Sequence, residues 1–308
     1  MRKILVLYNP SSGQQQAQRM AALASVLEVL RHGAADVRAS QTGSSAEATA
    51  QARAAVAEGC DAIFACGGDG TVHDILQGMA GSRVPLGVIP LGTANALAHD
   101  LGIPGQPEEA AKAALNGEPL RTALGEIECR GLDGTTIRRY FIVAAGIGAD
   151  AYLFYRLAPD VKRRLGMIAY VYKSLQVWLM HAKPWFEVEM GGTTHRASQV
   201  LAVRIRDFGN VLRELAPGAD LANNLLRLVM FHTRSRWLYL LYVLRGLLGL
   251  KYRVGGIELH SGDRVSCRLA AGEEQTIYVE ADGELIGTLP AEIRIVPDAL
   301  TLLAPRSA

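Results

Sequence analysis

The run Asp61–Cys66, followed by Gly67-Gly68-Asp69-Gly70-Thr71, decides the fold of this sequence. Its first part is short and largely apolar, which is typical of a strand buried on both faces of a sheet. Its second part turns the chain into a helix. Glycines in such a turn let backbone N–H groups approach an anion, and the helix N-terminus adds partial positive charge. The stretch therefore favours phosphate binding, although a tight turn alone has the same residues.

The elements around this stretch alternate between strand and helix. Apolar runs predict strands at Ile4–Tyr8, Asp36–Ser40, Asp61–Cys66 and Val84–Ile89. The first helix carries apolar residues three or four positions apart, at Met20, Leu23, Leu27 and Leu30, and is expected to stop at Gly33. The second begins with Ser44 and Glu47 in capping-box spacing. Strands that alternate with helices at this pace predict an α/β fold with a parallel, doubly wound sheet.

The pattern changes after about residue 122. Phe186, Val188 and Met190 alternate up to Gly191-Gly192, which indicates a two-residue hairpin turn. Further strand-like runs follow at Val200–Arg206, Leu225–Phe231, Arg264–Leu269, Thr276–Ala281 and Ile293–Val296, with helical stretches at Leu165–His181 and Trp237–Leu250. We therefore expect an α/β domain at residues 1–121 and a β-rich domain at residues 122–296.

Composition excludes several classes of protein. The 308 residues are 49% hydrophobic and 20% charged with a net charge of +2, which argues against disorder and against nucleic-acid binding. The cysteines lack C-x-x-C pairs, so cysteine-bound zinc and a disulfide scaffold are poorly supported. The apolar stretch Trp237–Leu250 contains Arg245 and is shorter than the roughly 20 residues of a membrane span. We expect a cytoplasmic protein.

Three loops follow the carboxyl ends of predicted parallel strands, so we expect them at one edge of the sheet. Ligands bind at this edge in doubly wound folds. They are Asn9–Gly13, Gly67–Thr71 and Leu91–Asn95. Asp69 would repel a bare phosphate, so its presence indicates a magnesium-bound nucleotide with Asp69 as a metal ligand. Neither the Walker loop nor a G-x-G-x-x-G after the first strand is present.

These residues resemble the signatures of a known family. Asn-Pro-Ser-Ser-Gly at 9–13, Gly-Gly-Asp-Gly-Thr at 67–71 and Pro-Leu-Gly-Thr-Ala-Asn at 90–95 are similar to the three motifs of the diacylglycerol kinase catalytic-domain family, which includes bacterial lipid kinases and sphingosine kinases. The resemblance continues through Gly146–Ala151, Ala216–Ala219 and Asp282-Gly283-Glu284, so it covers nearly the whole chain.

The resemblance implies an ATP-dependent lipid kinase of phospholipid metabolism with a fold like that of NAD kinases and diacylglycerol kinases. It implies that residues 297–308, with a strand around Leu300–Leu303, return to the first domain. Contacts to ATP and Mg²⁺ are implied for Asn9, Pro10, Ser11, Ser12, Gly13, Thr42, Gly67, Gly68, Asp69, Gly70, Thr71, Val72, His73, Thr93 and Asn95. Asp69, Asp282 and Glu284 are the implied catalytic residues, and the Asp282-Gly283-Glu284 turn supplies the proton acceptor. Without the resemblance, Asp282-Gly283 is equally a hairpin turn, and which carboxylate takes the proton stays open.

The sequence departs from the family at two acidic positions. Members usually carry Asp-Gly-x-Leu-Asp where this chain has Asn223-Asn224-Leu225-Leu226-Arg227, and an aspartate where it has Ala123. Divalent hard cations need oxygen ligands, so Arg227 would abolish a metal site there or replace the charge of the cation. Our hypothesis is that the second magnesium is absent and that Asp69 with the Asp282–Glu284 turn keeps the chain active.

Basic residues flank the candidate lipid-facing segment. Trp237–Leu250 lies between Arg234 and Arg236 on one side and Lys251 and Arg253 on the other. Such a segment can contact an anionic bilayer at the inner face of the membrane or pack on the β-rich domain, and Lys162-Arg163-Arg164 is a second basic cluster. An NAD kinase-like enzyme and a non-catalytic lipid- or nucleotide-binding homologue are the alternatives to a lipid kinase. The acceptor lipid and the oligomeric state stay open.

Overall fold

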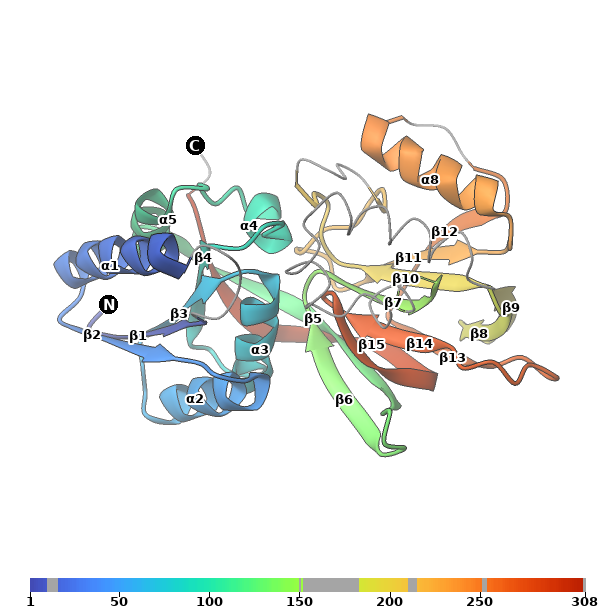
Figure 1. Cartoon of the computed structure of the whole chain (residues 1–308), viewed down its shortest axis with the longest axis horizontal. Helices are drawn as coiled ribbons and strands as arrows, with labels where there is room; N and C mark the ends of the chain where they lie inside the picture. Colours follow the sequence, from blue (N-terminus) through green and yellow to red (C-terminus); the bar gives the residue numbers. More distant parts are fainter. Residues whose placement is uncertain (10–15, 150, 152–182, 210–214, 251–253, 307–308) are drawn as a thin grey trace. The chain divides into compact units, whose positions relative to one another are not determined.

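The computed structural model of the chain describes residues 1–9, 16–149, 151, 183–209, 215–250 and 254–306 (Figure 1). The chain divides into unit 1, which is Met1–Leu124 with Pro297–Ala308, and unit 2, which is Gly125–Val296. Two strands run from one unit into the other: β5 (Glu118–Arg130) and β15 (Glu284–Ala304). The boundary that we expected between residues 121 and 122 falls inside β5, where the sequence has no break to mark it.

Unit 1 is built on a parallel sheet, as the sequence predicts. Its strands are β1 (Lys3–Tyr8), β2 (Asp36–Gln41), β3 (Ala62–Gly67) and β4 (Pro85–Pro90), in the order β4-β3-β1-β2. All neighbouring pairs are parallel. Thr301 and Leu302 near the end of β15 pair in parallel with Pro85 and Leu86 of β4. The crossovers needed between parallel strands are supplied by helices.

The helices of unit 1 cover both faces of this sheet (Figure 1). They are α1 (Gln16–Gly33), α2 (Ser45–Ala57), α3 (Asp69–Met79), α4 (Ala96–Asp100) and α5 (Pro107–Leu115). Helix α1 packs on α5, and α2 packs on α3. Gly78 permits the second contact, because a Cβ atom there would lie 2.3 Å from the carbonyl oxygen of Thr49. Every residue of β3 is buried, which explains its continuous apolar sequence.

The N-terminus of α2 confirms the predicted cap with one difference. The Ser44 side chain accepts the N–H of Glu47 at 3.2 Å. The Glu47 carboxylate accepts the N–H of Gly43 at 2.8 Å, one residue before the position that a capping box would use. The pair therefore orders the residue ahead of the helix as well as its first turn.

Unit 2 is built mainly of β-strands that form a branched sheet. Strands β12 (Ile257–Gly262), β11 (Leu226–Phe231), β10 (Gln199–Val203), β7 (Ala144–Gly148), β14 (Tyr278–Ala281) and β15 lie side by side in this order. Strands β13 (Arg264–Leu269), β8 (Phe186–Met190) and β9 (Thr193–Ala197) extend from β15 in another branch, and β5 with β6 (Thr136–Phe141) forms a third. Pairing between β10 and each of its neighbours is antiparallel, which agrees with the predicted β-rich domain.

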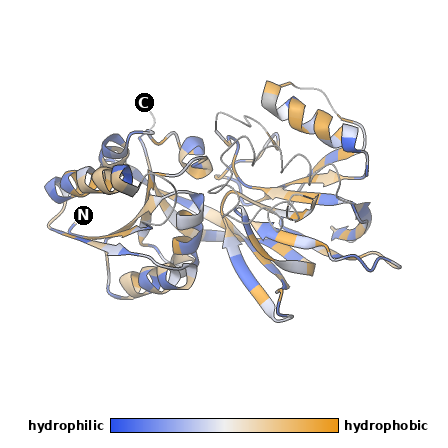
Figure 2. Cartoon of the chain, in the orientation of Figure 1, coloured by the Kyte–Doolittle hydropathy of each residue, from blue (hydrophilic) through white to orange (hydrophobic). Residues whose placement is uncertain are grey.

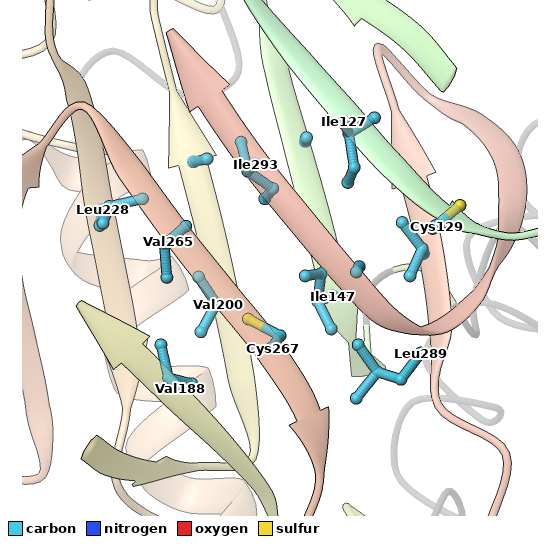
Figure 3. Packing of buried hydrophobic residues seen from close by; sticks show 14 of the residues in the cluster. Ile127, Cys129, Ile147, Val188, Val200, Leu228, Val265, Cys267, Leu289 and Ile293 are labelled. Atoms are coloured by element: carbon cyan, nitrogen blue, oxygen red, sulfur yellow. The ribbon is translucent and has the colours of Figure 1, made fainter. Parts of the chain in front are cut away.

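Strand β10 is buried on both faces because two separate cores cover it. Val200 and Ala202 belong to a core that also holds Ile147, Val265 and Ile293. Figure 3 labels Val200, Ile147, Val265 and Ile293 among the buried side chains of this core. Leu201 and Val203 point to the opposite face, where α8 (Arg236–Leu248) packs through Tyr239 and Tyr242. Side chains alternate along a strand, so the unbroken apolar run at Val200–Val203 reflects two covered faces.

The predicted hairpin at Gly191-Gly192 is confirmed, with φ angles of 57° and 76° that suit a two-residue turn. Its second strand is β9, a mostly polar edge strand that hydrophobic patterning does not reveal. The helical stretch expected at Leu165–His181 lies outside the described residues. Within the described ranges, the helices fall short of the length and apolar character that crossing a membrane requires.

A buried carboxylate joins the first and last strands of unit 2. Glu126 on β5 has a side-chain exposure of 4%, and its Oε1 accepts bonds from Nε and Nη2 of Arg294 at 2.9 and 2.7 Å. Glu292 and Arg264 form a pair of the same geometry, at 3.0 and 2.7 Å, but Glu292 is 39% exposed. The two pairs differ in burial, and Glu126 has in addition an ion pair with Arg138, whose Nε lies 3.4 Å from Oε1.

We expect Glu126→Ala to lower the free energy of unfolding of unit 2 by about 2 kcal/mol, because charge-assisted bonds in a buried site are lost. The matched variant Glu292→Ala should cost less than about 1 kcal/mol, because its pair is exposed to water. Urea unfolding followed by tryptophan fluorescence measures this, since all three tryptophans of the sequence fall between residues 125 and 296. Equal losses in the two variants would contradict the role given to burial.

Candidate functional site

The turn between β3 and α3 presents the N-terminus of a helix with no side-chain cap. Strand β3 ends at Gly67, and the N-cap residue of α3 is Gly68, which has no side chain to cap the helix. The Gly68 carbonyl accepts the N–H groups of Thr71 and Val72 at 3.0 and 3.2 Å, so the helix is formed from its first residues. Asp69 lies in that first turn. An uncapped helix N-terminus favours an anion.

The two glycine loops of unit 1 touch each other. A Cβ atom on Gly92 would lie 2.5 Å from the Cα atom of Gly68, a distance that no side chain tolerates. The N–H of Leu91 donates to the Gly67 carbonyl at 2.9 Å, which joins the loops through the backbone. The requirement for glycine at these positions therefore comes from the close approach of two chain segments, since Gly68 itself has an ordinary extended conformation with φ −93°.

Asn95 closes the loop that follows β4. Its φ angle of 50° is left-handed, which asparagine tolerates better than most residues. Its side-chain oxygen accepts the N–H of Gly92 at 2.9 Å, and its amide nitrogen donates to the Gly92 carbonyl at 3.0 Å. The sequence implies an ATP contact for Asn95, and the observed bonds give it a role in shaping the loop. Thr93 between them is exposed.

The remaining members of the Gly67–His73 segment are packed inward. A Cβ atom on Gly67 would meet Oγ1 of Thr71 at 2.3 Å, so the Thr71 side chain occupies the space beside the glycine. The side chains of Thr71, Val72 and His73 are buried, with exposures of 7%, 4% and 4%. Their implied contacts with ATP stay predictions, and burial places their side chains mainly in the packing of α3.

The end of β1 contributes a second part of the same sheet edge. Thr42 donates its N–H and its hydroxyl to the Tyr8 carbonyl at 2.8 and 3.2 Å, which ties the end of β2 to the end of β1. Tyr8 and Asn9 line a small cavity together with Cys66, Gly67, Leu91 and the α1 residues Arg19, Met20 and Leu23. Burial raises the pKa of the Cys66 thiol to about 12, so this cavity contains a neutral sulfur. Pro10, Ser11, Ser12 and Gly13 lie outside the described residues.

Asp282 and Gly283 form a two-residue hairpin between β14 and β15, with φ angles of 48° and 84°. The Asp282 carboxylate accepts the N–H groups of Ile142, Val143 and Ala144 at 3.1, 2.9 and 3.1 Å. Its own N–H donates to the Ala144 carbonyl at 2.8 Å. The hairpin interpretation is therefore confirmed, and Asp282 anchors the turn to the start of β7. The Glu284 side chain is exposed.

Arg227 stands where the family usually has an acidic residue. Its Nε donates to the Pro217 carbonyl at 2.6 Å, and its Nη1 donates to Oγ of Ser261 at 2.8 Å. The guanidinium thus places positive charge beside one carbonyl oxygen of the Ala216–Ala219 segment, that of Pro217. Ala123, the second departure, is buried on β5 with an exposure of 1%. Neither position offers a carboxylate to a divalent cation.

Sequence reasoning missed Arg204, which orders the segment before Arg227. Arg204 is fully buried, and its guanidinium donates to the carbonyls of Leu221, Asn223 and Leu225 at 3.1, 2.6 and 2.8 Å. Burial lowers the pKa of Arg204 to about 10. The available signal was an arginine inside the apolar run Val200–Arg206. A charged residue that is buried in a strand needs several hydrogen-bond partners, so this position predicts a structural role for Arg204.

Comparisons with known proteins cover nearly the whole chain. The model described as "Diacylglycerol kinase catalytic domain" matches residues 3–127, and that described as "YegS C-terminal NAD kinase beta sandwich-like domain" matches residues 142–304. A diacylglycerol kinase of Mycobacterium tuberculosis is 32% identical, with 99% of this chain and 96% of that protein covered.

Solved structures agree in fold. A crystal structure of a diacylglycerol kinase from Bacillus anthracis is 18% identical, covers 98% of this chain and 97% of its own, and has a TM-score of 0.72. Yeast NADH kinase in complex with NADH is 12% identical, with 99% and 84% covered and a TM-score of 0.52. These two likenesses concern the fold alone. The two domain matches and the identity along the whole chain show that this protein belongs to the diacylglycerol kinase catalytic-domain family.

Proposed function

We propose that this chain is an ATP-dependent lipid kinase that transfers the γ-phosphate to a hydroxyl of diacylglycerol or a related lipid. The observation that carries the proposal is the uncapped N-terminus of α3 at Gly68, which touches the Gly92 loop at the carboxyl edge of the sheet. Phosphoryl transfer depends on positioning and on neutralising charge, and backbone N–H groups at a helix N-terminus supply both for a polyphosphate.

Asp69 fits the proposed role of a magnesium ligand. It lies in the first turn of α3, beside the glycine loop, and its carboxylate offers the oxygen atoms that a hard cation requires. A magnesium ion held by Asp69 would supply positive charge to offset that of the phosphate groups. The protein's own contribution at this edge is to hold the nucleotide through the backbone and to keep Asp69 at the helix N-terminus, where a carboxylate is favoured.

The Asp282–Glu284 turn is proposed to supply the proton acceptor for the lipid hydroxyl. Three backbone N–H groups hold the Asp282 carboxylate, so the turn has a fixed conformation. Glu284 follows at the start of β15 with an exposed side chain. This arrangement favours Asp282 as the anchor and leaves Glu284 as the carboxylate that can approach a substrate. A general base of this kind contributes about 100-fold or more to the rate.

The proposal includes activity without a second magnesium ion near Arg227. The Arg227 guanidinium already donates to the Pro217 carbonyl and to Ser261, which supports replacement of a cation by the arginine. The same substitution, together with Ala123, is the observation that favours the alternative of a non-catalytic binding protein. An NAD kinase-like activity is the other alternative, favoured by the shared fold.

Helix α8 is proposed to contact the membrane that carries the lipid. Trp237, Leu241, Leu244 and Leu248 recur four, three and four positions apart, which places them on one face, and their exposures are 79%, 41%, 41% and 68%. Figure 2 shows apolar residues along much of this helix. The opposite face packs through Tyr239 and Tyr242 on Phe231. Arg236 adds exposed positive charge at the start of the helix, whereas Arg234 is paired with Glu273 at 3.3 Å. An apolar face beside cations suits an anionic bilayer surface.

The other basic residues that the sequence places near a membrane, Lys162-Arg163-Arg164, Lys251 and Arg253, lie outside the described residues.

The assay of function is transfer of label from ATP to a lipid extract, with NAD in a separate tube. We expect label in the organic phase, followed by identification of the product by mass spectrometry. Label on NAD would support the NAD kinase alternative, and no transfer in either tube would support the non-catalytic alternative. Asp69→Asn and at least one of Asp282→Asn and Glu284→Gln should reduce the rate by about 100-fold or more.

The control for the turn variants is Asp298→Asn. Asp298, like Asp282, has a φ angle of 48°, but it is exposed and belongs to neither proposed site. Asparagine tolerates a positive φ, so the backbone conformation at residues 282 and 298 should be retained in the two asparagine variants. If Asp69→Asn and both turn variants retained the rate of the Asp298→Asn protein, the assignment of catalytic residues would be wrong.

Gly92→Ala should raise the KM for ATP at least tenfold, because the added methyl group would lie 2.5 Å from the Gly68 Cα atom and force the two loops apart. Gly105→Ala is the matched variant: a Cβ atom at Gly105 meets nothing within 4 Å. Steady-state kinetics with varied ATP would measure both proteins. An unchanged KM in Gly92→Ala would mean that the contact between the loops does not shape the nucleotide site.

Replacing Leu241 and Leu248 together by serine should weaken binding to vesicles that contain anionic lipid by about 30-fold, because each exposed leucine contributes about 1 kcal/mol when it leaves water. Leu132→Ser, which alters a leucine that is 61% exposed in the turn between β5 and β6, is the control. Co-sedimentation with vesicles would measure the affinity. Equal binding by all three proteins would exclude α8 as the contact.

A further inference from the structure

Unit 2 carries a cluster of imidazole and carboxylate groups at the β12 end of its sheet. His232, Glu258 and His260 each offer one donor atom, and these atoms all lie within 4.8 Å of one another. Glu258 and His260 are two residues apart on β12, so their side chains share a face. His232 follows β11, and its N–H donates to the Gly256 carbonyl at 2.8 Å, which fixes its backbone beside β12.

The hydrogen bonds of His232 determine which of its nitrogens can bind a cation. Nδ1 lies 2.9 Å from the Arg196 carbonyl, and a carbonyl only accepts, so Nδ1 carries the hydrogen. In the neutral ring, Nε2 is then left with its lone pair. This atom is buried from solvent and has no hydrogen-bond partner. A metal-binding histidine typically has this arrangement, with its second nitrogen donating to a backbone carbonyl.

The buried lone pair of His232 points toward a carboxylate. Nε2 of His232 lies 3.6 Å from Oε2 of Glu258, which is too long for a hydrogen bond. Nε2 of His260 lies within hydrogen-bond distance of the same oxygen, at 3.2 Å. Nε2 of His232 and the Glu258 carboxylate are both acceptors and repel each other, so a cation between them stabilises the group. Donors about 2.1 Å from a tetrahedral ion are about 3.4 Å apart, close to both observed separations.

A third imidazole borders the cluster. The ring centroid of His195 on β9 lies 6.0 Å from that of His232 and 5.5 Å from that of His260. Three histidines and a carboxylate favour a borderline ion such as zinc, because magnesium and calcium prefer oxygen ligands alone. The cysteines do not compete for such an ion, since all four are buried.

We propose that His232, Glu258 and His260 form a binding site for a divalent transition-metal ion, with zinc as the ion that fits best. The ion joins the chain at His232 to the edge strand β12. Helix α8 lies in the segment of chain between His232 and β12. The metal ion would therefore link the two ends of the segment that carries α8. The site is separate from Asp69, which belongs to unit 1, and from Arg227, which alternates with Leu228 onto the other face of β11.

The proposal is tested by calorimetric titration of the full chain with zinc after treatment with a chelator and without nucleotide. We expect one saturable zinc per chain. His232→Ala, Glu258→Gln and His260→Ala should each weaken binding at least tenfold. Asp69→Ala should bind zinc as the unaltered chain does, which distinguishes this site from the nucleotide site whatever the kinase assay shows.

His32→Ala is the matched control. Nδ1 of His32 also lies against a backbone carbonyl, that of Glu28 at 2.7 Å, but His32 belongs to no group of metal donors among the described residues. Glu258→Gln keeps the shape of the side chain, and a zinc-dependent rise in Tm that is present in the unaltered chain and lost in Glu258→Gln provides a second readout if a histidine variant fails to fold. No saturable zinc, or equal binding by His32→Ala and all three ligand variants, would overturn the proposal.

Discussion

The contact between Gly68 and Gly92 is the constraint on which the nucleotide edge of unit 1 depends. Strands β3 and β4 are parallel neighbours, so their carboxyl ends bring the two loops to the same place. Only glycines allow the two backbones to approach this closely. The approach leaves the N-terminus of α3 without a side-chain cap, and the same geometry that fixes the loops therefore also presents backbone N–H groups to a ligand.

Buried charge in unit 2 is held by backbone groups and by specific partners. Asp282 accepts three backbone N–H groups, and Arg204 donates to three backbone carbonyls. Glu126 instead pairs with the guanidinium groups of Arg294 and Arg138. Burial of an ionised group is costly unless such bonds replace water, so each of these residues fixes the segment that it touches. Arg227 stands at the position where the family usually has an acidic residue. It likewise donates to a backbone carbonyl, that of Pro217, which would otherwise be open to a cation.

Local patterns predicted a large part of the fold and part of the candidate site. Apolar runs placed β1, β3 and β4 within a residue or two, and the glycine loop marked the start of α3. The polar strand β9 and the long strand β5 escaped prediction, because Thr193–Ala197 has no apolar pattern and β5 crosses the boundary between the two units without a break in the sequence. The motifs named Asn95 and Asp282. Asn95 bonds to Gly92 within its own motif, whereas the partners of Asp282 at residues 142–144 are distant in the sequence and spacing does not reveal them.

By itself, the sequence determined the parallel sheet of the first unit, the glycine turn and membership of a kinase family. Each of these depends on patterns of residues that are close together along the chain. Only the tertiary structure decided which side chains anchor and which remain accessible. Burial of His73, the three donors on Asp282 and the meeting of His232 with Glu258 and His260 all arise from strands that are brought together by folding. Hydrogen bonding and exposure are properties of such neighbours, and a linear pattern does not contain them.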